Sequence, residues 1–299
     1  MADIHELVDR MRSIRDTLKI TNAMYLISSN NFQKSKRKLE NAEPYYYNIQ
    51  YAMLRILRNL EEDVTVYIKK NNDEGKKKKR AFVIIGCDKG MAGDYNHEVL
   101  RNVEKFMGEC ESSRNFVLGE LTRHTLVSHG IPVEKDFIKN VASPTQHRAR
   151  LVMSKVLPLY KSGEVDEVWI LYTMLDNGVA PDLIMEKLLP LERDESVWVN
   201  GMHMSDWGAG MHYESVEMLP SPEAVMDVVI PNYLTGYIYC SMLQSNCSEE
   251  NSRMKAMKNA CDNANDMLTE LEGSYNRARQ AQITQEITEI IAGATAQKK

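Results

Sequence analysis

The stretch IHELVDRMRSIRDTL, from Ile4 to Leu18, determines how the rest of the chain is interpreted. Its apolar residues recur at alternating steps of three and four, which is the heptad spacing of a coiled-coil helix. The same register continues to Leu60 through Tyr25, Phe32, Leu39, Ala42, Tyr46, Ile49, Met53 and Ile56, with Thr21, Ser28 and Ser35 as polar members. The pattern predicts one long N-terminal helix that packs on a partner helix, with a kink or a break at Pro44.

The C-terminal third of the chain carries a second heptad register. Its members are Tyr233, Gly236, Cys240, Leu243, Cys247, Glu250, Met254, Met257, Cys261, Ala264, Leu268, Leu271, Tyr275 and Ala278. The stripe then jumps to Ile283, so we expect the helix to stop facing its partner after Ala278. Each helix spans about 60 residues, or roughly 90 Å. Two such helices can fold back as an antiparallel pair, although heptads alone do not fix their direction.

The region between the two helices alternates strand and helix patterns after a polar linker, NNDEGKKKKR, at residues 71–80. Strands are predicted at residues 81–86, 115–119, 132–138 and 166–175, and helices at residues 95–109, 120–130 and 142–160. This alternation predicts a doubly wound, mostly parallel sheet in a Rossmann-like α/β domain. Residues 196–219 are irregular and leave room for short strands. The expected organisation is a coiled-coil helix at 1–70, an α/β domain at 71–220 and a second coiled-coil helix at 221–299.

The composition narrows the possible classes of protein. The chain has 299 residues, 43% of them hydrophobic, and a formal net charge of -5, which weighs against a dedicated nucleic-acid-binding protein. It contains no apolar run long enough for a membrane span, and its charged start, MADIHELVDRM, differs from a signal peptide. The five cysteines include no C-x-x-C pair, so we expect reduced, buried thiols in a cytoplasmic protein.

The glycine-bearing stretch IIGCDKGMAGDYN, residues 84–96, follows a predicted strand and opens a helix. Such a loop can cradle a phosphate, but the spacing of Gly86, Gly90 and Gly93 fits neither the Walker motif nor the dinucleotide fingerprint. A tight strand-to-helix turn that needs permissive backbone is the favoured interpretation. The histidines lie on unrelated segments. We therefore expect no catalytic site, no metal and no cofactor.

The basic run from Lys76 to Arg80 has two interpretations. It could meet a membrane surface or an acidic partner. A solvated linker is the interpretation we favour.

The last helical stretch, RARQAQITQEITEIIAGATA at residues 277–296, has no proper core face. Ile283, Ile287, Ile290 and Ile291 form a thin apolar stripe beside small threonine and alanine side chains. Chain ends usually fray unless something holds them. The stretch therefore predicts a helix tip that contacts another molecule without being buried in this chain.

Three segments resemble the gamma subunit of F-type ATP synthases. MRSIRDTLKITNAM, residues 11–24, is similar to the first helix of that family, and CDKGMAGDYN, residues 87–96, to its glycine-bearing turn. MKAMKNACDNANDMLTELEGSYNRARQAQITQEITEIIAGATA, residues 254–296, resembles its C-terminal helix over the whole length. The chain departs from the family in YLISSNNFQ after KITNAM, in YYYNIQ at residues 45–50, and in its acidic net charge.

The resemblance implies a rotor shaft with no active site of its own. The two end helices would form an antiparallel coiled coil inside a ring of alpha and beta subunits, and the α/β domain would bind the epsilon subunit and the membrane c-ring. The complex would lie on the cytoplasmic face of a bacterial membrane. Contacts between shaft and ring in this family match Met24, Arg279, Gln280, Thr284 and Glu286.

Two other functions compete with the rotor. One is a free coiled-coil adaptor that has lost the ring, and the other is a nucleotide-dependent enzyme built on the central sheet. The half-polar helix tip favours the rotor over the adaptor, since an adaptor needs no bearing. The missing phosphate-loop spacing weighs against the enzyme.

Overall fold

A computed structural model of the chain describes residues 4–59, 66–68, 78–107, 112–135, 137, 141, 143–176, 180–191, 198–199, 202–203 and 217–296. The chain divides into two compact units. The smaller unit joins the two ends of the chain, Met1–Asn30 and Arg253–Lys299, and the larger unit is Asn31–Ser252.

Two long helices dominate the described part of the chain, as the heptads predict. Helix α1 spans Ile4–Asn59 and helix α6 spans Pro222–Ala296. Helix α1 runs without interruption through Pro44, so of the predicted kink or break the break does not occur. Proline removes one helical hydrogen bond. Nearby on the same helix, Gln50 and Met53 are buried, and this packing holds the helical path.

The heptad registers describe the buried faces correctly. Every described member of both registers is buried or half-buried, and none is exposed. In the larger unit, Ser35 Oγ donates a hydrogen bond to Asn246 Oδ1 at 2.6 Å, and Asn31 Nδ2 donates one to Glu250 Oε1 at 3.5 Å. Residue numbers thus rise along α6 as they fall along α1. The two helices are therefore antiparallel, as the family resemblance implies, although the heptads alone left their direction open.

The central sheet has the strand order β2-β1-β3-β4. Its strands are β1 (Lys79–Ile85), β2 (Ser112–Leu118), β3 (Glu167–Asp176) and β4 (Ala180–Leu189). Strand β1 pairs in parallel with β2 and β3, which confirms the predicted parallel core of the sheet. Strand β4 pairs antiparallel with β3 and was not predicted.

The helices of the α/β region agree with the sequence, but one predicted strand does not. Helices α2 (Tyr95–Met107), α3 (Glu120–Ser128) and α4 (Gln146–Lys161) lie where helices are expected. The described part of the predicted strand at 132–138 has no strand structure. It contacts β2 through Glu134 N–H to Asn115 O at 3.0 Å and Asn115 Nδ2 to Pro132 O at 2.8 Å. Pro132 has no N–H to donate, so it removes one of the hydrogen bonds that a strand ladder would use there.

Two very short strands, β5 (Trp198–Val199) and β6 (Met202–His203), pair in the stretch expected to be irregular. Most of the remainder of that stretch lies outside the described residues.

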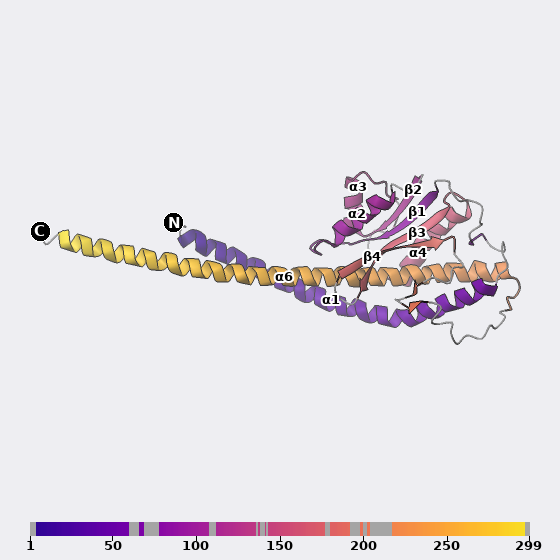
Figure 1. Cartoon of the computed structure of the whole chain (residues 1–299), viewed down its shortest axis with the longest axis horizontal. Coiled ribbons are helices and arrows are strands. Elements are labelled where there is room, and N and C mark those ends of the chain that lie inside the picture. Colours follow the sequence, from indigo (N-terminus) through magenta and orange to yellow (C-terminus); the bar gives the residue numbers. More distant parts are fainter. Residues whose placement is uncertain are drawn as a thin grey trace. The chain divides into compact units, whose positions relative to one another are not determined.

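Helices cover both faces of the sheet (Figure 1). Helices α2 and α3 pack on one face against Phe82, Ile84 and Leu171. Helix α4, the end of α1 and the first part of α6 pack on the other face. Ile230 and Ile238 of α6 are fully buried there. The first part of α6 therefore belongs to the core of the α/β unit.

Candidate functional site

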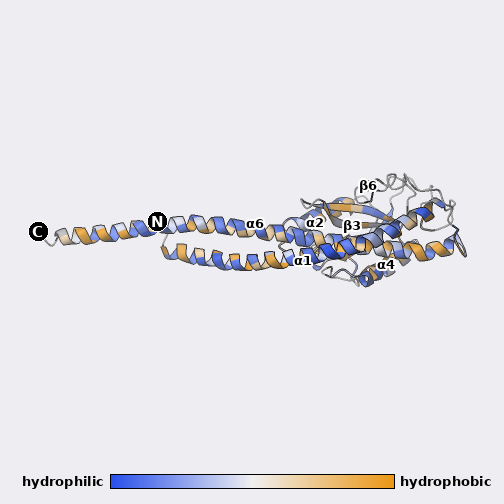
Figure 2. Cartoon of the chain, turned by 90° about the horizontal axis from the view of Figure 1, so that it is seen from below, coloured by the Kyte–Doolittle hydropathy of each residue, from blue (hydrophilic) through white to orange (hydrophobic). Residues whose placement is uncertain are grey.

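The last part of α6 is exposed along its whole circumference. Ala278 is half-buried, and every residue from 279 to 294 is exposed. This confirms the predicted point at which the helix loses its partner. Figure 2 shows hydrophobic residues recurring among hydrophilic ones toward the C-terminal end of α6. The exposed fractions are 43% for Ile283, 52% for Ile287, 71% for Ile290 and 61% for Ile291. An exposed apolar stripe of this kind is a candidate contact surface.

The polar side chains of the tip bond mainly along the helix itself. Thr284 Oγ1 donates a hydrogen bond to Gln280 O at 2.8 Å. Gln282 Nε2 donates to Glu286 Oε1, and Gln285 Nε2 to Glu289 Oε1, both at 2.9 Å. These bonds orient the tip without holding it to another element.

Arg279 and Gln280 differ from the other tip residues. Within the described residues, neither side chain has a hydrogen-bond partner, and both residues are exposed. An arginine guanidinium and a glutamine amide offer several donors in fixed geometry. Of the predicted contact residues, these two are the ones best placed to recognise carboxylate or carbonyl oxygens of a partner.

Helix α1 contributes a second exposed apolar group that the sequence analysis missed. Met24 is half-buried. Near it, Ile20, Leu26 and Ile27 are 64%, 59% and 60% exposed. All three lie outside the heptad register, and that was the available signal. An apolar residue that the coiled coil does not use is a candidate for a contact with another molecule.

The glycine-bearing loop after β1 is a packed turn. A Cβ atom at Gly86 would lie 2.1 Å from Thr122 Oγ1 of α3, so only glycine lets the two segments approach. Thr122 Oγ1 accepts a hydrogen bond from Cys87 N at 2.8 Å and donates one to Asn96 Oδ1 at 2.8 Å. Gly93 adopts a positive φ of 63°. These contacts support the turn interpretation of the motif.

A carboxylate of the chain itself lies at the start of α3. Asp88 Oδ1 accepts a hydrogen bond from Glu120 N at 3.1 Å, and its Oδ2 accepts one from Val141 N at 2.8 Å. Free N–H groups at a helix N-terminus are what would attract a phosphate. Asp88 already uses one of these donors, so a carboxylate of the chain itself occupies the N-terminus of α3.

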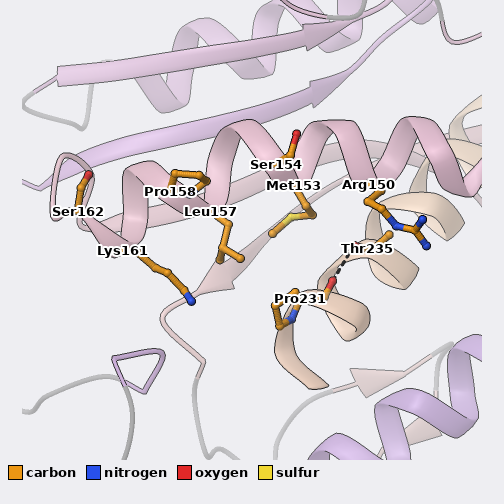
Figure 3. A pocket seen from close by; sticks show the side chains of 9 residues that line it. All are labelled: Arg150, Met153, Ser154, Leu157, Pro158, Lys161, Ser162, Pro231 and Thr235. Atoms are coloured by element: carbon orange, nitrogen blue, oxygen red, sulfur yellow. Dashed lines mark hydrogen bonds between the residues drawn. The ribbon is translucent and has the colours of Figure 1, made fainter. Parts of the chain in front are cut away.

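A groove of about 660 Å³ lies between α4 and the first part of α6 (Figure 3). Its lining residues are Arg150, Met153, Ser154, Leu157, Pro158, Lys161, Ser162, Pro231 and Thr235. Lys161 Nζ binds Asp227 Oδ1 at 3.1 Å and lies 5.3 Å from the ring centre of Tyr67. The lining holds no pairing of a nucleophile with a base. Across the described residues, no group of three or more His, Cys, Asp and Glu could hold a metal ion.

The described end of the basic run is part of the fold. Lys78 Nζ and Arg80 Nε bind the two carboxylate oxygens of Glu167 at 2.8 and 3.0 Å, and Glu167 is 4% exposed. The solvated-linker interpretation is therefore wrong for these two residues. Lys76 and Lys77 lie outside the described residues.

The described cysteines behave as small apolar residues. Cys87, Cys240 and Cys247 are buried and Cys261 is half-buried, while Cys110 lies outside the described residues. Burial raises the pKa of the Cys240 thiol to about 12 and that of Cys247 to about 11. Both are therefore protonated near neutral pH and poor nucleophiles.

Among the described helices, none is long and apolar enough to cross a membrane.

The chain is similar to one family along nearly its whole length. The family model described as "ATP synthase" matches residues 3–297. The ATP synthase gamma chain of Acetivibrio thermocellus is 38% identical over 301 residues, covering 100% of both chains. That of Caldanaerobacter subterraneus subsp. tengcongensis is also 38% identical, covering 96% of this chain and 97% of the relative. A sodium ion specific gamma chain from Acetobacterium woodii is 32% identical and covers 98% of each.

Solved structures share the fold. A chain of the central stalk and c-ring of the Tetrahymena thermophila mitochondrial ATP synthase has a TM-score of 0.57 at 21% identity, covering 81% of this chain and 99% of that one. A chain of the Euglena gracilis mitochondrial ATP synthase has a TM-score of 0.66 at 12% identity, covering 98% and 94%.

Proposed function

This chain belongs to the ATP synthase gamma chain family, and from that premise we propose how its parts serve an F-type ATP synthase. It is the non-catalytic rotor subunit of the central stalk. Its rotation couples ion flow through the membrane c-ring to ATP synthesis or hydrolysis on the beta subunits. The observation that supports this best is the match over residues 3–297 in a chain whose α6 tip is exposed on all sides.

In this proposal the exposed tip of α6 turns inside the ring of alpha and beta subunits. Ile283, Ile287, Ile290 and Ile291 provide a narrow apolar bearing, and the small side chains beside them avoid interlocking with the ring. A fully buried isoleucine contributes about 1.5–3 kcal/mol. A narrow stripe therefore gives enough contact to centre the shaft without fixing one angle.

The proposed contacts between shaft and ring are Arg279, Gln280, Thr284 and Glu286 on α6, together with Met24 on α1. The donors of Arg279 and Gln280 meet carboxylates or carbonyls of the ring at certain angles of rotation. Ile20 and Ile27 extend this contact along α1. These assignments rest on exposure, on bonding pattern and on the family resemblance.

The α/β unit is the part that we assign to the epsilon subunit and the c-ring. The protein would then be a peripheral protein on the cytoplasmic face of a bacterial membrane, and the relatives named above at 32–38% identity are bacterial. Neither nucleic acid nor a cofactor has a role in this proposal.

Co-expression with alpha and beta subunits tests the proposal. The full-length chain should co-purify with both subunits as an assembly that hydrolyses ATP. A chain that ends at Ala278 is the matched control, because it keeps the heptads and lacks the exposed tip. If the full-length chain does not associate with the alpha and beta subunits in gel filtration, the adaptor function replaces the rotor.

A further inference from the structure

The inner face of strand β4 carries the carboxylate of Glu186 between two apolar residues, while Asp182, further along the same face, is exposed. Side chains alternate along a strand, so Ile184, Glu186 and Leu188 point to the same face. Ile184 pairs with Tyr172 of β3 and Glu186 pairs with Ile170. Ile170 is fully buried and Leu188 is 3% exposed. Glu186 itself is half-buried. It thus faces the core that the sheet shares with α1 and α6.

Tyrosines from three elements line the core on the side of the sheet that this carboxylate faces. Tyr46 comes from α1, Tyr172 from β3, and Tyr233 and Tyr237 from α6. The ring centre of Tyr237 lies 5.5 Å from that of Tyr46 and 6.3 Å from those of Tyr172 and Tyr233. Burial raises the pKa of Tyr46, Tyr172 and Tyr233, and the charge of Glu186 raises the pKa of all three further.

The neighbours of Glu186 provide no positive charge. Within the described residues, no hydrogen bond or ion pair joins its carboxylate to another group. Lys187 points to the opposite face, where its Nζ lies 5.6 Å from the Trp169 ring centre. Cys240 of α6 also faces Tyr46 and Tyr172, and burial raises its pKa to about 12. Near neutral pH the tyrosines and this thiol are uncharged.

We propose that Glu186 is a proton-binding site that links the packing of β4 on α1 and α6 to pH near neutrality. With a proton from solvent on its carboxylate, Glu186 packs among the tyrosines as a neutral group. The ionised carboxylate is stabilised by hydration, so its ionisation weakens the packing of this edge of the sheet on the helices. The α/β unit therefore holds its two helices more tightly in a mildly acidic medium than in an alkaline one.

The direction and size of the effect follow from linkage. Burial raises the pKa of Glu186 from 4.5 to about 7 in the folded chain. The folded state therefore binds the proton more strongly, and stability falls as pH rises from the ordinary value through the folded value. For that difference, the opening equilibrium constant rises about tenfold between roughly pH 6 and pH 8. Well below pH 4.5, the ordinary pKa, stability no longer depends on this group, because Glu186 is protonated in both the folded and the open state.

Hydrogen–deuterium exchange of the full-length chain tests the proposal, with rates corrected for intrinsic exchange. Peptides from β3 and β4 in the unaltered chain should exchange about tenfold more slowly at pH 6 than at pH 8. Glu186→Gln mimics the neutral acid and should give slow exchange at both values. Glu270→Gln, at an exposed site on α6, is the matched control and should follow the unaltered chain. If Glu186→Gln keeps the full pH dependence, the proposal is wrong.

A second measurement keeps the test valid if Glu186→Gln fails to fold. In the full-length chain labelled with carbon-13 at glutamate carboxyl groups, one signal should titrate near pH 7. That signal should be missing from Glu186→Asp, which retains a carboxylate but not the label. A chain whose glutamates all titrate near their ordinary pKa, or a signal that persists in Glu186→Asp, would overturn the assignment.

Discussion

Arg15 Nη2 lies 2.8 Å from Glu272 Oε1, and this ion pair joins α1 to α6 within the smaller unit. Both side chains are about half exposed, so the pair contributes little to stability. The pair shows which residues of the two antiparallel helices lie at the same level. Ile4, where α1 begins, is eleven residues before Arg15, and eleven residues beyond Glu272 is Ile283. The first isoleucine of the apolar stripe therefore lies level with Ile4, the first residue of α1, and the rest of the stripe extends beyond it.

Replacing Arg279 and Gln280 together by alanine should lower the ATPase rate of the assembled complex more than it lowers assembly. These donors bond the ring at certain shaft angles, so their loss changes the relative energies of ring states. Losing a state-dependent contribution of about 1.4 kcal/mol changes a rate roughly tenfold. The measurement is steady-state ATP hydrolysis normalised to intact complex.

Two controls make that comparison specific. Gln282→Ala with Gln285→Ala removes amides that bond within the helix, and it should have a smaller effect. Truncation from Ala292 removes five small residues together with Gln297, Lys298 and Lys299, and should also do little. If the truncation abolishes ATP hydrolysis while the Arg279→Ala/Gln280→Ala variant hydrolyses ATP at the unaltered rate, the contact is assigned to the wrong residues.

The isoleucine stripe should matter to the complex and not to the chain alone. Replacing Ile283 and Ile287 by serine should change the free energy of unfolding of the isolated chain by less than about 0.5 kcal/mol each, since both are exposed. The same change should weaken association with the alpha and beta subunits. Leu268→Ser is the contrast, because Leu268 is 9% exposed and its loss should destabilise the chain by about 2–4 kcal/mol. If the serine substitutions at Ile283, Ile287 and Leu268 lower the free energy of unfolding equally, the isoleucine stripe is not an exposed surface of the chain.

The structure shows where sequence patterns carry the fold and where they do not. The heptads located both long helices, and the irregular step after Ala278 located the exposed tip, because burial on a helix repeats with its turn. Strand β4 escaped prediction because Glu186 places a charge on its inner face and weakens the alternation. The exposed Ile20 and Ile27 lie outside the heptad register, but that position alone did not predict that they would be exposed, because a helix buries more residues than its register when other elements pack on it.

Glu167 should contribute to stability in a pH-dependent way. Its burial alone would raise its pKa, but hydrogen bonds from Lys78 and Trp169 and the charges of Lys78 and Arg80 lower it on balance. A lowered folded pKa means that the stabilisation is present above the ordinary value and is lost as pH falls through the folded value. Glu167→Gln should lower the free energy of unfolding at neutral pH by about 2–4 kcal/mol.

Denaturant unfolding at neutral and acidic pH measures this contribution. Glu164→Gln is the matched control, since its ion pair with Arg114 is exposed and should contribute less than about 1 kcal/mol. A Glu167→Gln variant as stable as the Glu164→Gln variant would mean that Lys78 and Arg80 do not depend on this carboxylate.

Single-molecule rotation tests the central claim most directly. The chain would be assembled with alpha and beta subunits fixed to a surface, and a bead attached through Ser128→Cys on the exposed end of α3. If the chain is the rotor, ATP should drive the bead in one direction, and the Arg279→Ala/Gln280→Ala variant should slow it. Sustained ATP hydrolysis with a stationary bead, in assemblies shown to contain the intact chain, would contradict the account.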